Sequence, residues 1–199
     1  MFAIVDYDTG NTRNLIKALD YLKIENKLTD DPNEIINADA VILPGVGAFA
    51  AAMAELQKRD LVNVLKQVAA NKTPMLGICL GMQLLFDSSE EYGKHTGLGL
   101  INGNVKAIPA DVKVPQMGWN QNRILRNGPF NIIDQQFTYF VHSYYADCPQ
   151  ETVVAGVDYG TFIPSIVQND NVYGMQFHPE KSGKVGLELL EKFQGVVEA

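Results

Sequence analysis

A cysteine between two glycines carries the clearest chemical pattern in the chain. Cys79 lies in Gly77-Ile78-Cys79-Leu80-Gly81, where an apolar run is followed by a helical pattern. A strand that turns sharply into a helix leaves no room for flanking side chains, so the two glycines are typical of a nucleophile elbow. The helix N-terminus would favour the thiolate of Cys79. The alternative interpretation is a small buried cysteine without a chemical role.

A histidine and a carboxylate two residues apart form the second pattern. In Gln176-Phe177-His178-Pro179-Glu180, an extended backbone would place His178 and Glu180 on one face, with Pro179 keeping the link extended. Such a carboxylate orients the imidazole of a general base and stabilises its protonated form. Alone, the pair is more typical of a surface ion pair. Because His178 and Cys79 both follow strands, at the edge where doubly wound sheets bind ligands, we interpret them with Glu180 as a catalytic triad.

A glycine-rich turn follows another apolar run. Leu43-Pro44-Gly45-Val46-Gly47 could direct backbone N–H groups into the same crevice, where acyl chemistry needs donors for an oxyanion. The N–H of Leu80, just after the nucleophile, would be the second donor. An ordinary turn or a phosphate loop is the alternative. The turn lacks the Gly-Lys-Ser/Thr ending of a P-loop, so nucleotide binding is disfavoured.

Other polar residues are weaker candidates. Gln83 lies one helical turn after Cys79 and therefore on the same face. The segment His142-Ser143-Tyr144 ends an apolar run. We interpret His95 as a surface residue and Cys148, in a polar turn, as structural. Because the cysteines and histidines are scattered singly, no zinc-type spacing exists, and we expect neither a metal nor a cofactor.

The composition of the chain narrows the classes of function that it could have. The chain has 199 residues and a net charge of −7, which disfavours a nucleic-acid partner. With 46% hydrophobic and 20% charged residues, it has the composition of a globular domain. Two cysteines, a charge at Asp6 and no basic leader lead us to expect a cytoplasmic protein without a signal peptide. The longest uncharged stretch, 40–54, is broken by Pro44 and is too short to span a bilayer.

Apolar runs alternate with helical patterns in the first half of the chain. This alternation predicts right-handed crossovers and a mostly parallel sheet covered by helices on both faces, which makes an α/β three-layer sandwich. The expected strands are 2–5, 24–28, 40–43 and 74–78, and the expected helices are 11–22, one starting at 31–34, 50–57, 61–70 and 80–86.

The second half reads differently. Short β-rich runs separated by turns predict antiparallel hairpins over 153–157, 163–168 and 172–177. The apolar spacing over 185–193 predicts a last helix that packs on the sheet. We expect an exposed loop over 88–96. No linker interrupts the pattern, so we treat 1–199 as one domain.

The motifs together resemble a known family, the class I glutamine amidotransferases. The resemblance rests on the glycine turn, the cysteine elbow with Gln83, and His178-Pro179-Glu180, in this order. Further segments look like one branch, the glutaminase subunits of imidazole glycerol phosphate synthase: 6–11, 115–120, 139–144 and 178–182. The departures are Gln116, where the family commonly has His, and Ala48, at a variable position.

The resemblance implies a flavodoxin-like fold and a role for each matching residue. Cys79 would attack the side-chain amide of glutamine, His178 would transfer protons and Glu180 would orient His178. Further matching residues would form the oxyanion hole and hold the glutamine: Gly45, Val46 and Leu80 for the oxyanion, and Gln83, His142, Ser143 and Tyr144 for the substrate.

The resemblance also implies a partner. Ammonia would pass to a separate (β/α)8-barrel cyclase subunit in a heterodimer, which makes imidazole glycerol phosphate and an aminoimidazole carboxamide ribotide in histidine biosynthesis. Residues that match the interface are Asn11, Asn14, Trp119, Tyr139 and Lys181. The alternatives are the glutaminase subunit of anthranilate or aminodeoxychorismate synthase, a catalytically silent interaction module of this fold, and a cysteine peptidase-like hydrolase.

Overall fold

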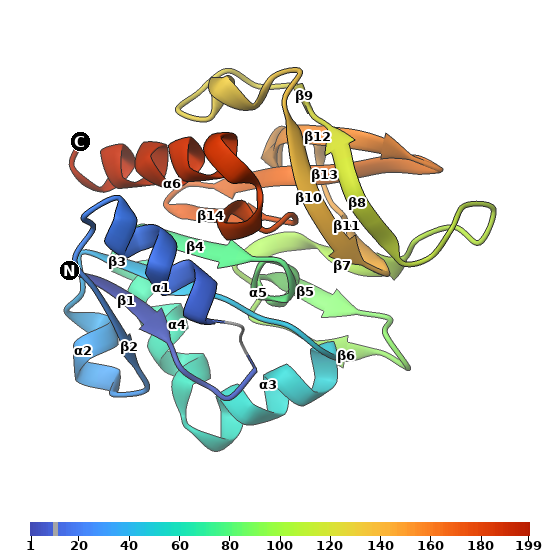
Figure 1. Cartoon of the computed structure of the whole chain (residues 1–199). Coiled ribbons are helices and arrows are strands. Elements are labelled where there is room, and N and C mark those ends of the chain that lie inside the picture. The colour runs from blue at the N-terminus through green and yellow to red at the C-terminus, as the bar shows by residue number, and fades with distance from the viewer. Residues whose placement is uncertain (10–11) are drawn as a thin grey trace.

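An eight-stranded sheet forms the centre of the molecule. A computed structural model of the chain describes residues 1–9 and 12–199. The strand order is β2-β1-β3-β4-β14-β13-β12-β9, and the first five of these strands are parallel (Figure 1). In this order the strands span Asn26–Thr29, Phe2–Val5, Ala40–Leu43, Met75–Ile78, Val172–Met175, Thr161–Asn169, Val153–Tyr159 and Arg123–Ile124.

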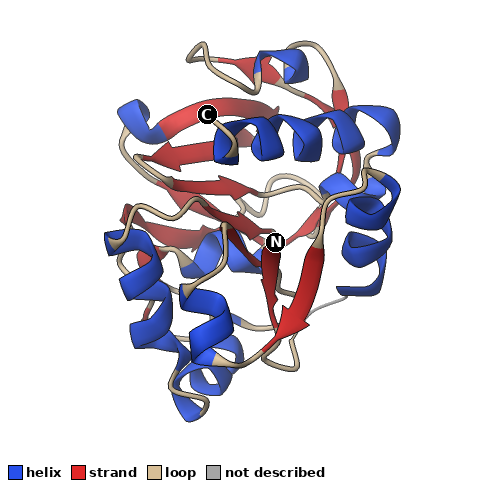
Figure 2. Ribbon diagram, turned by 90° about the vertical axis from the view of Figure 1, so that its left-hand side faces the viewer, coloured by secondary structure: helices blue, strands red, loops and turns tan. Residues whose placement is uncertain are grey.

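Helices cover both faces of this sheet, as Figure 2 shows. The alternation of side chains along β1 divides the core, because Phe2 and Ile4 point to one face while Ala3 and Val5 point to the other. The first face packs on α1 (Thr12–Tyr21) and α6 (Gly183–Val197). The second face packs on α2 (Pro32–Ile36), α3 (Phe49–Lys58) and α4 (Leu61–Ala70).

Two smaller sheets lie beside the carboxyl ends of the parallel strands. One has the order β11-β7-β5-β6, over Tyr144–Asp147, Ile101–Ala107, Phe86–Ser89 and His95–Thr96. The other is an antiparallel ribbon of β10 (Phe137–His142) and β8 (Gln116–Gln121). The remaining elements are α5 (Leu80–Leu84) and 3-10 turns at Asn131–Ile133, Gln150–Thr152 and Pro179–Lys181.

Three expectations about secondary structure are wrong in part. The expected loop over 88–96 contains β5 and β6, and Ser89 is fully buried, because these short polar strands gain their hydrogen bonds from β7 and from each other. The helix expected over 80–86 ends at Leu84, and Phe86 already begins β5. The second strand begins at Asn26, two residues later than expected.

The general architecture agrees with the sequence analysis. The expected hairpins exist, since β12 pairs antiparallel with β13, and β13 with β14. The side chain of Asp31 caps α2 by accepting bonds from the N–H groups of Asn33 and Glu34. Among the described residues, no helix has both the length and the apolar character needed to cross a membrane.

Candidate active site

Cys79 lies on a strained turn at the carboxyl end of β4. Its φ of 55° and ψ of −114° are unusual for a residue with a side chain. A Cβ on Gly81 would lie 1.8 Å from the carbonyl oxygen of Leu43, and a Cβ on Gly77 would lie 2.7 Å from the carbonyl oxygen of Gly81. Both positions therefore require glycine, and the elbow predicted from the glycine spacing is present.

Strand pairing brings His178 to Cys79. Strands β4 and β14 are parallel neighbours with Met175 opposite Ile78, and the N–H of Cys79 donates to the Met175 carbonyl at 2.8 Å. Three residues later, His178 Nδ1 lies 2.8 Å from Glu180 Oε1, with both side chains only 4% exposed. The expected contact therefore exists, but the expected extended link is wrong, because Pro179–Lys181 forms a 3-10 turn.

The protonation of His178 depends on its neighbours. Burial alone would lower its pKa, but the Cys79 sulfur and the Glu180 carboxylate together outweigh burial and raise the pKa to about 9. Nδ1 is held by Glu180, and the buried Nε2 forms no hydrogen bond of ordinary geometry with another described residue. At neutral pH the ring is therefore protonated, with one N–H held by Glu180 and the other, on Nε2, available as a proton donor in the site.

A cavity of about 480 Å³ opens beside Cys79. Its walls come from segments that are far apart in the chain: Val46, Gly47, Cys79, Leu80, Gln83, Glu91, Tyr92, Pro115, Val141, His142, Ser143, Tyr144, His178 and Lys181. The volume suits an amino acid, and Glu91 and Lys181 supply one charge of each sign.

Buried polar groups form part of the cavity wall. Gln83 Nε2 donates to the Tyr144 carbonyl at 2.9 Å and to Gln176 Oε1 at 3.0 Å. His142 Nδ1 lies 2.7 Å from the same Tyr144 carbonyl. Burial lowers the pKa of His142 to about 4, so its ring is neutral, with Nδ1 donating and Nε2 left as an acceptor.

Two hydrogen bonds join the turn after β3 to the loop after β1. Tyr7 Oη donates to the Pro44 carbonyl at 2.5 Å, and the Val46 N–H donates to the Thr9 carbonyl at 2.7 Å. A Cβ on Gly45 would lie 2.6 Å from Tyr7 Oη, so the close approach requires glycine. In this conformation the Val46 amide is committed to Thr9 and is not a free donor.

Comparison with known proteins identifies the family. The family model "Glutamine amidotransferase class-I" matches residues 3–195. The chain belongs to the class I glutamine amidotransferase family. An imidazole glycerol phosphate synthase subunit HisH from Lactiplantibacillus plantarum is 64% identical over 202 residues, which cover 100% of this chain and 97% of that protein. The HisH of Bacillus cereus strain G9842 is 52% identical over 201 residues, with 100% and 96% coverage.

Solved structures agree with the fold. A glutamine amidotransferase crystal structure superposes with a TM-score of 0.79 at 18% identity, covering 99% of both chains. The structure of PurLQS from Thermotoga maritima gives 0.77 at 20% identity, covering 98% of both. The expected family, fold class and enzyme class are thus confirmed: this is a glutamine amidotransferase that groups with HisH subunits of imidazole glycerol phosphate synthase.

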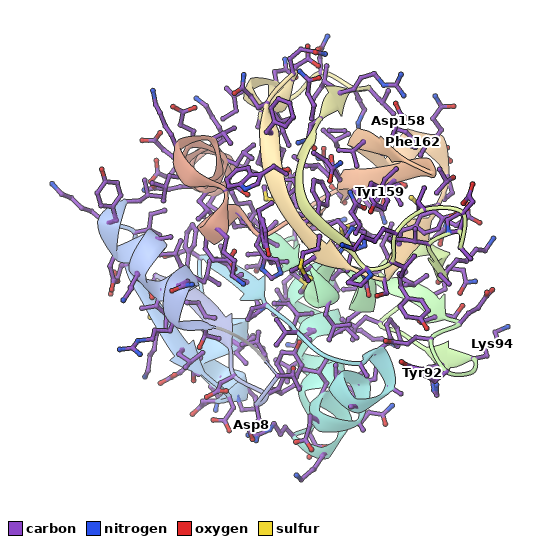
Figure 3. All side chains as sticks on the ribbon, turned by 45° about the vertical axis from the view of Figure 1, so that its right-hand side comes forward. Asp8, Tyr92, Lys94, Asp158, Tyr159 and Phe162 are labelled. Atoms are coloured by element: carbon purple, nitrogen blue, oxygen red, sulfur yellow. The ribbon has the colours of Figure 1, made fainter. Side chains whose placement is uncertain are left out.

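Two residues that line the cavity of this amidotransferase, Glu91 and Tyr92, were not predicted from the sequence. Glu91 Oε2 accepts the N–H of Phe49 at 2.6 Å and thereby caps α3. Tyr92 is 88% exposed and extends, like Lys94, from the connection between β5 and β6 (Figure 3). The adjacent acidic pair at 90–91 was part of the expected loop, and no local pattern marks either residue.

The described residues that we expected at the partner interface lie in three separate places. Trp119 and Tyr139 form an edge-to-face pair with ring centroids 6.1 Å apart, on the outward face of the β8–β10 ribbon. Lys181 lines the cavity and Asn14 is exposed on α1, whereas Asn11 lies outside the described residues. Exposed apolar side chains of the same ribbon are Met117 and Phe137.

The remaining residues named in the sequence analysis are Gln116, His95 and Cys148. Gln116 is fully buried on the inner side of the ribbon and donates to Asn120 Oδ1 at 3.0 Å. His95 is partly exposed in β6. Burial raises the pKa of Cys148, which disfavours its thiolate.

Proposed function

We propose that the chain hydrolyses glutamine to glutamate and ammonia with Cys79, His178 and Glu180, as a single amidotransferase domain over 1–199. The observation that carries the proposal is the convergence of these three side chains at the ends of two neighbouring parallel strands, beside a cavity of amino-acid size. The identity to HisH proteins over the whole chain supports the same reaction.

The reaction follows from the positions of the protons. Because the pKa of His178 is raised to about 9, its Nε2 already holds the proton given up by the Cys79 thiol when the sulfur attacks the amide carbon of glutamine. The carbon–nitrogen bond then breaks, and His178 returns the proton to the departing ammonia. Water hydrolyses the glutamyl thioester, which releases glutamate and restores the thiol. Glu180 keeps Nδ1 protonated throughout and stabilises the imidazolium.

The cavity supports glutamine as the substrate. Gln83, His142, Ser143 and Tyr144 lie along the wall near Cys79, where the sequence analysis expected the substrate. Glu91 is the carboxylate among the lining residues, so it is suited to the α-ammonium group of the bound amino acid. We assign the oxyanion to the N–H of Leu80 together with the turn at Gly45 and Val46.

The Val46 amide gives this enzyme a resting conformation. While Val46 donates to Thr9, the oxyanion hole lacks one donor, and one donor is typically worth about 10²–10³ in kcat. The free chain should therefore turn over slowly until the turn is rearranged. A slow free enzyme avoids releasing ammonia when no acceptor is present.

We assign the acceptor to a (β/α)8-barrel cyclase of histidine biosynthesis, bound as a heterodimer. HisH relatives are named as synthase subunits, which supports a partner chain. The exposed aromatic face of the β8–β10 ribbon is a suitable contact surface. It is connected to the site, because the Tyr139 carbonyl accepts the N–H of His178 at 3.0 Å. The cytoplasmic location stays a prediction.

Glutaminase assays test the proposal. Steady-state turnover of glutamine is measured for the chain alone, with the cyclase, and with the cyclase and its ligand. We expect a low rate alone and the highest rate with the ligand present. A chain that hydrolyses no glutamine in any of the three conditions would contradict the proposed reaction, whereas equal rates in all three would contradict only the resting conformation.

A further inference from the structure

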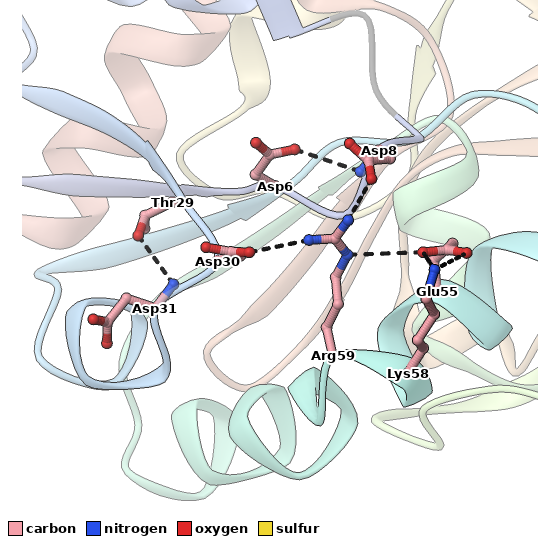
Figure 4. A network of polar contacts seen from close by, with 8 residues as sticks. All are labelled: Asp6, Asp8, Thr29, Asp30, Asp31, Glu55, Lys58 and Arg59. Carbon is pink, nitrogen blue, oxygen red and sulfur yellow. Dashed lines mark hydrogen bonds and ion pairs between the residues drawn. The ribbon is translucent and has the colours of Figure 1, made fainter.

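The guanidinium group of Arg59 pairs with several carboxylates, as Figure 4 shows. Arg59 caps the end of α3, and its Nη1 donates to Asp30 Oδ2 at 3.0 Å. Its Nη2 pairs with Asp8 Oδ2, and its Nε lies 3.8 Å from Glu55 Oε2. The Arg59 side chain is only 25% exposed, whereas Asp8 is 72% and Asp30 is 59% exposed, so solvent partly screens these pairs.

Asp8 is held in an unfavourable backbone conformation. Its φ is 61°, in the left-handed region, and its N–H lies 3.4 Å from Asp6 Oδ1. A residue with a side chain adopts this conformation at some cost, which the pairing with Arg59 offsets. The next residue is Thr9, whose carbonyl accepts the Val46 N–H. The orientation of that carbonyl therefore depends on the conformation of Asp8.

Helix α3 connects both sides of this hydrogen bond. Its first residue, Phe49, follows the turn that contains Val46. Its C-terminal cap, Arg59, forms an ion pair with Asp8 in the loop that contains Thr9. The Val46 N–H donor is thus linked to α3 through the chain. The Thr9 carbonyl acceptor is linked to α3 through the ion pair between Arg59 and Asp8.

We propose that Arg59 is a positioning residue that, through Asp8, holds the Thr9 carbonyl against the Val46 amide and keeps the free chain at low activity. This inference rests on the proposed function, because it concerns the same oxyanion turn. Weakening the Arg59–Asp8 pair releases Thr9 and frees the Val46 amide, without a change in Gln83, His142 and Tyr144, which are held by their own hydrogen bonds.

The variant Asp8→Asn tests this role, because Asn tolerates the left-handed region while losing the charge. Arg59 keeps Asp30 and Glu55 as partners, so the fold should persist. The matched control is Asp170→Asn. Asp170 also has a positive φ, 54°, and pairs with Lys72 far from the site.

We expect Asp8→Asn to raise the kcat of the free chain about two- to five-fold, as expected for loss of one partly exposed ion pair. KM and the rate of the complex with cyclase and ligand should be unchanged, and Asp170→Asn should match the original chain. Hydrogen exchange should become faster at the Val46 amide in Asp8→Asn alone.

Unchanged exchange at Val46, or faster exchange with an unchanged kcat of the free chain, would overturn the proposal. An increase of the same size in the kcat of Asp170→Asn would also overturn it. The effect would then arise from the loss of any surface negative charge and not from the Arg59–Asp8 pair. If no chain hydrolyses glutamine even with the cyclase, the proposed function fails, while Val46 exchange still decides whether Arg59 holds the turn.

Discussion

The elbow around Cys79 can be tested by adding one methyl group to Gly81. In Gly81→Ala the new Cβ would lie 1.8 Å from the Leu43 carbonyl oxygen and 2.8 Å from its carbonyl carbon. Both atoms belong to the backbone of the central strand β3, which cannot move aside as a flexible side chain could. Forcing extra volume into packed surroundings costs about 1–3 kcal/mol, and a backbone clash of this depth belongs at or above the upper end.

Gly195→Ala is the matched control for this change. Gly195 lies in α6 and is exposed. Apart from its chain neighbours and the backbone of its own helix, no described atom lies within 4 Å of a Cβ built on it. Alanine in an exposed helix is more favourable than glycine by roughly 0.5–1 kcal/mol. The same substitution should therefore stabilise the protein slightly at one position and destabilise it strongly at the other.

Two measurements check the prediction for Gly81→Ala. Urea denaturation should show a loss of about 3 kcal/mol in the free energy of unfolding, which corresponds to a melting temperature lower by roughly 6–12 °C. Glutaminase turnover should fall by about 10²-fold in the folded variant, since a shift of about 1 Å in Cys79 disrupts the reacting geometry. Stability and turnover equal to those of the original chain would refute the elbow argument.

Further predictions concern the triad. Cys79→Ala should abolish glutamine hydrolysis while partner binding persists, and Cys148→Ala should keep most activity; the reverse result would show that the nucleophile is misassigned. His178→Asn should cost about 10³-fold or more in kcat, and Glu180→Gln less, because Glu180 orients rather than transfers a proton. NMR titration should give His178 a pKa of about 9, which falls in Cys79→Ala. Because this pKa lies above the ordinary value of 6.5, the stability that His178 contributes is complete below pH 6.5 and is lost as pH rises through about 9. The free energy of unfolding of the original chain should therefore fall with pH across this range, relative to that of His178→Asn. A relative free energy of unfolding that rises with pH would contradict the assignment.

Local patterns were sufficient for the parallel half of the fold. Strands β1, β3 and β4 are short apolar runs bounded by charge, proline or glycine, and each is buried along its whole length. The helices follow from apolar residues at helical spacing. The elbow follows from glycine spacing, because the steric demand of that turn acts on neighbours in the chain.

The features that sequence could not give depend on contacts between distant segments. Ser89 is buried by pairing with β7, although its own segment is polar. Glu91 caps a helix that begins 42 residues earlier, and Thr9 accepts an amide from the turn after β3. The turn from His178 to Glu180 is set by tertiary packing, so the predicted contact is right while the predicted extended backbone is wrong.

The pairing of β4 with β14 has a consequence for the order in which the site is built during synthesis. Strand β4 is complete at Ile78, but its neighbour β14 does not begin until Val172. Until then, β4 is an open edge of the nascent sheet, and Cys79 does not have His178 beside it. Non-local pairings of this kind form slowly and expose unpaired edges while they wait. Any chain that stops before Glu180 therefore carries Cys79 but not the whole of the proposed triad. If the proposed function holds, incomplete synthesis yields a silent product rather than an unregulated source of ammonia.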